Sequence, residues 1–99
     1  MKPISYSITD KLVRFKEYTA AWTYIEIPLN KVPDVDPGGW GAIPVEVTLG
    51  SSTWQTSMFP LGKNLPYFLP IKKPILKKEN LKLGDKVTVN YFTTRKSAF

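Results

Sequence analysis

Few side chains in this chain could carry out chemistry, and none belongs to a familiar catalytic set. The sequence has no histidine and no cysteine, so the usual general base, the thiolate nucleophile and the commonest zinc ligands are missing. A hydrolase would need a serine activated by a lysine, or two carboxylates flanking a substrate. Ser57 and Lys72 are the conceivable pair, and the eight acidic residues show no useful spacing. We therefore assign no catalytic, cofactor-binding or metal-binding residue and expect no cofactor.

Basic side chains gather in the second part of the chain. Residues 1–60 carry five basic and six acidic side chains, whereas residues 61–99 carry nine basic and two acidic ones. Such asymmetry is typical of an anionic partner, but also of a well-solvated surface. The basic region 63–86 is therefore a candidate for binding single-stranded nucleic acid or another polyanion.

Aromatic residues supply the second ingredient of a binding surface. Trp40 lies in the stretch GWG, and Tyr67 begins the run YFLPI. Bases stack on exposed rings, yet a small domain also uses aromatic side chains in its core, so the direction of Trp40 stays open. No recognised nucleic-acid-binding motif accompanies them. The predicted ligand or partner surface consists of Trp40, Ser57, Tyr67, Lys72, Lys73 and Lys77.

Composition indicates one small globular domain. A chain of 99 residues with 42% hydrophobic and 13% aromatic content has the apolar area for one modest core. Its first residues contain no apolar signal-peptide core, and no apolar run approaches the roughly 20 residues of a membrane helix. We expect a cytoplasmic protein with no membrane association, which agrees with the absence of cysteine.

Hydrophobic residues recur mostly with a period of two, which indicates strands. The segments ISYSI, LVRFKE and WTYIEIP show this alternation, as do YFLPI and the last segment around VTVNY. The proline- and glycine-rich stretch LNKVPDVDPGG predicts a loop, with room for one helical turn near Leu29–Lys31.

The segment 43–58 predicts a hairpin of defined register. The Gly-Ser pair at 50–51 has glycine at the first central position, as a two-residue type II′ turn requires. This register pairs Val47 with Trp54 and puts the apolar residues of both strands on one face. A slip by one residue would move them all to the other face. We therefore expect Trp54 to be largely buried and Ser57 to lie on the opposite face.

The stretch KKPILKKENLKLGDKV predicts a short helix followed by a turn. Pro74 suits the first helical position, Leu76 can face the sheet, and Asn80 can adopt the left-handed conformation that ends a helix. Lys72 precedes the helix, where unpaired backbone N–H groups attract anions. Lys72 could therefore hold a carboxylate or phosphate, and the simpler alternative is a solvated side chain.

Six or seven strands and one or two short helices, joined by closely spaced turns, predict a mainly β domain. A small closed or split β-barrel suits this pattern best, because closure removes strand edges that promote aggregation. We expect one domain over residues 1–99, with a core from about residue 4 to 92 and a flexible tail at 93–99.

Three stretches also follow one another in a familiar order. They are WTYIEIP, GWGAIPVEVTLGSSTWQTSMFP and YFLPIKKPILKKENLKLGDKVTV. Together they resemble a bacterial family of small domains called DUF1905, over roughly residues 4–92. The resemblance implies a compact β-barrel with no established activity, substrate or cofactor. In some relatives the domain precedes a helical segment linked to bacteriocin protection. Only about seven residues follow Phe92 in this sequence, which leaves that association open.

Three functional hypotheses follow. The leading one is a non-catalytic binding or interaction module for an unknown small ligand or protein partner, with barrel mouths and sheet edges as plausible sites. The first alternative is binding of nucleic acid or another polyanion through the basic region 63–86. The second is an enzyme of unknown class. The oligomeric state is left open.

Overall fold

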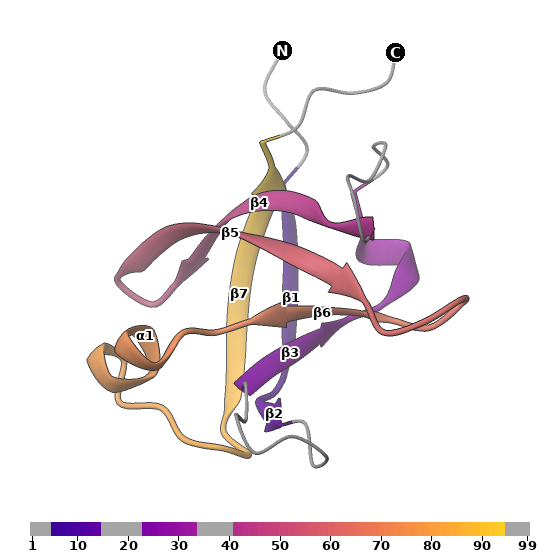
Figure 1. Cartoon of the computed structure of the whole chain (residues 1–99). Coiled ribbons are helices and arrows are strands. Elements are labelled where there is room, and N and C mark those ends of the chain that lie inside the picture. Colours follow the sequence, from indigo (N-terminus) through magenta and orange to yellow (C-terminus); the bar gives the residue numbers. More distant parts are fainter. Residues whose placement is uncertain (1–4, 15–22, 34–40, 95–99) are drawn as a thin grey trace.

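The computed structural model describes residues 5–14, 23–33 and 41–94 of the chain. Within these residues seven antiparallel strands follow one another (Figure 1): β1 (Tyr6–Lys11), β2 (Val13–Arg14), β3 (Thr23–Ile27), β4 (Ile43–Leu49), β5 (Ser52–Pro60), β6 (Tyr67–Pro70) and β7 (Lys86–Thr93). They are joined by one helix, α1 (Lys73–Lys78), and one 3-10 turn, η1 (Leu29–Lys31). The predicted fold class, a mainly β domain of six to seven strands with one or two short helices, is confirmed.

The strands are arranged as a nearly closed barrel in the order β1-β7-β4-β5-β6-β3-β2. Only Leu12 separates β1 from β2 along the chain, so the first and last strands of this order belong to one bent segment. At the bend, the Leu12 backbone N–H donates to the Asp85 carbonyl oxygen at 2.9 Å, and the Leu12 carbonyl accepts from Gly84 at 3.0 Å. The bend therefore lets one segment pair with β7 on one side and β3 on the other.

The core lies inside the barrel and is built by the alternation seen in the sequence. In β4 the side chains of Ile43, Val45, Val47 and Leu49 are buried, while those between them are half-buried. Because a strand turns successive side chains to opposite faces, this pattern gives one face that is shielded from solvent. The same alternation in β7, together with buried residues of β3 and β6, completes a continuous cluster of buried hydrophobic side chains.

The predicted hairpin register is confirmed for every pair from Ile43 with Met58 to Leu49 with Ser52. Gly50 has a φ of +60°, as the first central residue of a type II′ turn requires. Trp54 lies on the core-facing side and packs against the core, as the register predicted. It keeps partial exposure because the middle of β5 has a neighbouring strand on one side only.

The sequence predicted Pro74 as the first residue of the helix. Helix α1 begins one residue earlier, at Lys73, so Pro74 is its second residue. The end of the helix follows the prediction, because Asn80 has a φ of +55°. The backbone N–H of Leu81 reaches back to the carbonyl oxygen of Leu76 at 2.8 Å, which is the bond of a Schellman motif. This geometry turns the chain sharply toward β7.

Strand β7 continues through Thr93, the first residue of the predicted tail. The Thr93 hydroxyl donates to the Pro44 carbonyl oxygen at 2.9 Å, and the Thr94 N–H donates to the same oxygen at 3.2 Å. Residues 95–99 lie outside the described part. Among the residues that are described, no helix has the length and apolar character needed to cross a membrane.

Candidate binding groove

The barrel is split between β5 and β6. These two strands pair only at the end of β5, where Phe59 lies opposite Phe68 and Pro60 opposite Tyr67. Beyond this point β6 stays with β3, while β5 follows β4 toward the hairpin turn. The two strands therefore diverge, and the first part of β5 faces the segment that connects β6 to α1.

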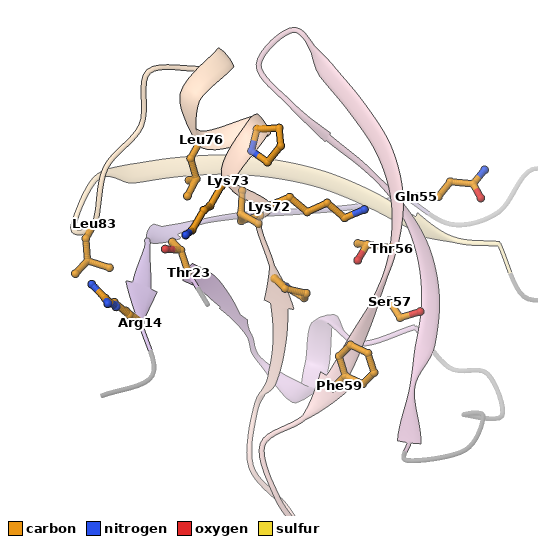
Figure 2. A pocket seen from close by; sticks show the side chains of 13 residues that line it. Arg14, Thr23, Gln55, Thr56, Ser57, Phe59, Lys72, Lys73, Leu76 and Leu83 are labelled. Atoms are coloured by element: carbon orange, nitrogen blue, oxygen red, sulfur yellow. The ribbon is translucent and has the colours of Figure 1, made fainter. Parts of the chain in front are cut away.

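An open groove of about 1120 Å³ occupies this split (Figure 2). One wall is β5, and the other is the segment from the end of β6 into the first turn of α1. The ends of β2 and β3 and the loop after α1 complete the lining. The lining residues are Arg14, Thr23, Gln55, Thr56, Ser57, Phe59, Pro70, Ile71, Lys72, Lys73, Pro74, Leu76 and Leu83.

The charged side chains of the groove all have one sign. Arg14, Lys72 and Lys73 line it, and none of the described lining residues is acidic. All three cations are exposed, so each would attract an anion at 4 Å in water with only about 1 kcal/mol. A ligand that excluded water from the groove would feel this attraction more strongly. The Lys72 side chain extends across the groove toward Thr56 on β5 (Figure 2).

The remaining lining is apolar or neutral. Ile71 is buried beneath the groove, whereas Leu83 is 53% exposed. The Phe59 ring stacks on Phe68, with 5.4 Å between ring centroids and 30° between ring planes. Several threonine, serine and glutamine side chains on β5 and β3 add uncharged hydrogen-bonding groups. The groove can therefore hold a ligand that is apolar in one part and anionic in another.

The structure brings together three of the six residues predicted for a ligand surface. Ser57, Lys72 and Lys73 line the groove. Lys77 is exposed on α1 and does not line it. Tyr67 is half-buried on β6, packs against the core and also lies outside the lining. The sixth predicted residue, Trp40, falls outside the described residues.

Arg14, Gln55 and Phe59 are lining residues that the sequence did not single out. For Arg14 no local signal exists, because only the bend at Leu12 carries β2 to this side of the barrel. For Gln55 and Phe59 a signal was present, because the hairpin register places both on the same outward face as Ser57.

The structure places the one conceivable catalytic pair in the same groove. Ser57 and Lys72 share the groove, but no hydrogen bond joins them. The Lys72 side chain is exposed to solvent. Within the described ranges, no group of three or more acidic residues is placed to hold a metal ion.

Glu79, directly after α1, is hydrogen-bonded to the tip of the β4–β5 hairpin and so joins the two walls of the groove. Figure 1 shows α1 near this hairpin. Its Oε2 accepts hydrogen bonds from the hydroxyls of Ser51 and Ser52, at 2.9 and 2.7 Å. Its Oε1 accepts from the Ser51 backbone N–H at 3.3 Å. Ser52 is only 3% exposed, so its hydroxyl depends on this partner.

We expect the Glu79 contact to make the folded state sensitive to acid. The hydrogen bonds from Ser52 and Ser51 lower the pKa of Glu79 below its ordinary value of 4.5. A carboxylate with a lowered pKa stabilises the fold above its unfolded pKa, and this contribution is lost as pH falls through the folded pKa. Below about pH 4.5, the melting temperature of the native protein should therefore fall more steeply than that of Glu79→Gln. Identical pH profiles for the two proteins would show that the carboxylate charge does not matter.

Comparison with known proteins gives a family match. The family model described as a domain of unknown function, DUF1905, matches residues 10–90. This range contains the split between β5 and β6 and every described residue that lines the groove. No curated protein and no solved structure matches the chain. Since the match covers most of its length, the chain belongs to the DUF1905 family of domains of unknown function.

Proposed function

We propose that this domain is a non-catalytic binding module whose groove takes a ligand that is anionic in one part and apolar in another. The observation that supports it is the lining of the groove, which combines Arg14, Lys72 and Lys73 with apolar side chains and includes no described acidic residue. The proposal keeps the sequence-based expectation of a bacterial, cytoplasmic setting.

The groove supports this function better than binding of a long polyanion. Of the lysines in the region 63–86, only Lys72 and Lys73 line it. The others lie in the loop before β6, on α1, in the turn after α1 and at the start of β7. A nucleic-acid strand needs a continuous basic track with exposed aromatic rings. In the described chain, only Arg14, Lys72 and Lys73 come together, and they do so at one short groove.

Charge reversal tests the proposal with anilinonaphthalene sulfonate, a fluorescent probe that is both aromatic and anionic. Replacing Lys72 and Lys73 together by glutamate should weaken probe binding roughly tenfold or more, because each reversed charge adds repulsion of about 1 kcal/mol at short range. Fluorescence titration at low salt measures the change, and added salt should reduce it.

The matched control reverses Lys77 and Lys78 instead. These two lysines are exposed on the same helix, and neither lines the groove. The net charge changes by the same amount, so long-range attraction is equal in the two variants. If both variants weakened probe binding equally, the groove would have no role of its own and the proposal would be rejected.

A further inference from the structure

We infer that the ligand of this groove is an extended acidic peptide, which adds as an extra strand to the open edge of β5. The inference rests on the proposed function, because it uses the same cations to select the ligand. It goes further by assigning the main chain of β5 as the principal recognition element.

The open edge follows from the hairpin register. In an antiparallel pair, residues whose main-chain groups bond across the pair alternate with residues whose groups point away. The two-residue turn makes Leu49 and Ser52 a bonded pair, so the residues that point away from β4 are Thr53, Gln55 and Ser57. Among the described strands, none pairs with β5 at these positions. Their N–H and C=O groups are therefore directed toward the side on which β5 and β6 separate.

This edge also has the features of a docking site for a strand. Exposed edges are usually protected by charged residues, proline or a bulge, but the residues from Thr53 to Ser57 are uncharged and contain no proline. The edge is limited at one end by the Glu79 contact with Ser52 and at the other by the pairing of Phe59. With a rise of roughly 3.3 Å per residue, about four to six peptide residues would fit between these limits.

Charge selects the occupant. The Lys72 side chain already extends across the groove toward β5 (Figure 2), and Arg14 and Lys73 line the same space. An added strand with acidic side chains on one face and small apolar side chains on the other would meet these cations and the apolar floor together. A second copy of β5 would suit the groove poorly, because β5 carries no acidic residue.

The decisive experiment compares two N-methylated peptides on the native protein. The parent probe is a fluorescein-labelled peptide of alternating glutamate and valine, about eight residues long to exceed the span of the open edge. One isomer carries methyl groups on the glutamate amides, and the other on the valine amides. Alternate residues direct their N–H groups to opposite edges of a strand, so each isomer blocks a single edge while charge and composition stay equal.

Strand addition predicts that one isomer binds roughly tenfold or more weakly than the parent, because bonds to β5 are lost, while the other binds within about twofold. Equal affinities of the two isomers, whether high or low, would reject strand addition. If the Lys72 and Lys73 reversal still weakened binding of the sulfonate probe, the proposed function would survive this failure. Tighter binding of single-stranded DNA than of the parent peptide would likewise overturn the inference.

Amide hydrogen exchange then locates the added strand. On binding the parent peptide, exchange at Thr53, Gln55 and Ser57 should slow about tenfold or more, as new main-chain hydrogen bonds protect them. Trp54 and Thr56 provide the matched control, because their amides already bond to β4. Slowing confined to other strands would place the peptide elsewhere and reject the site.

Discussion

Tyr91→Ala is expected to lower the free energy of unfolding by about 3–5 kcal/mol, as removal of a large buried side chain does. Tyr91 is only 1% exposed and lies in the core on β7. Its ring stacks on Tyr6, with 5.5 Å between ring centroids. Its hydroxyl donates to the Lys31 carbonyl oxygen at 2.6 Å and so holds η1 against the barrel. Urea unfolding followed by circular dichroism measures the loss.

Tyr91→Phe separates packing from hydrogen bonding. The ring and its stacking on Tyr6 are kept, while the Lys31 carbonyl oxygen loses its donor. We expect a loss of about 1 kcal/mol, the usual net value of one such bond. Burial raises the pKa of the Tyr91 hydroxyl well above its ordinary value, so the group stays a donor at neutral pH. If the phenylalanine variant were as unstable as the alanine variant, the hydrogen bond and not the ring would be the main contribution.

The elements built from local patterns were predictable from the sequence. The β4–β5 hairpin follows from Gly50 at its turn and from strict alternation on both sides, since any other register would expose apolar residues. The end of α1 follows from Asn80, a residue type that tolerates the left-handed conformation. The core-facing direction of Trp54 was predictable in the same way, but the exposure that it keeps was not, because this depends on whether a second strand covers β5.

Local sequence patterns could not predict the groove, because its lining also depends on contacts between distant segments. Its residues come from β2, β3, β5 and the segment entering α1, and only the complete strand order brings these together. The sequence indicated Ser57, Lys72 and Lys73 through their residue types. It could not indicate Arg14, which the bend at Leu12 carries to the groove. The split itself results from the pairing of β6 mainly with β3, a strand that is distant in the sequence.

The contact of Glu79 with the hairpin turn could not be predicted from local sequence patterns either. In the sequence it is one acidic residue among the lysines of a short helix. In the structure it accepts from both hydroxyls next to the hairpin turn, from Ser51 and Ser52. The contact joins segments 27 and 28 residues apart along the chain. Because of this contact, position 50 requires glycine both for its positive φ and for the space that Glu79 occupies beside it.

Gly50→Ala is expected to destabilise the protein strongly, although less than Tyr91→Ala, because it combines two effects. The φ of +60° at Gly50 strains any residue with a Cβ, at a cost of roughly 1–2 kcal/mol. In addition, the new Cβ would collide with the Oε1 atom of Glu79, so this side chain must shift, and we expect the shift to weaken its hydrogen bonds to Ser51 and Ser52. We therefore expect a loss of unfolding free energy larger than the backbone strain alone, measured by urea unfolding.

Gly84→Ala is the matched control for the backbone part. Gly84 has a φ of +89°, but a Cβ there would meet no atom within 4 Å. Gly84→Ala should therefore lower the free energy of unfolding only by the cost of backbone strain, about 1–2 kcal/mol. The collision is then isolated by a double-mutant cycle with Glu79→Ala. Once Glu79 is truncated, Gly50→Ala should cost no more than Gly84→Ala, because only backbone strain remains. An unchanged cost of Gly50→Ala in the Glu79→Ala background would mean that the hairpin turn and α1 are energetically independent, and that the wall of the groove is not held by this contact.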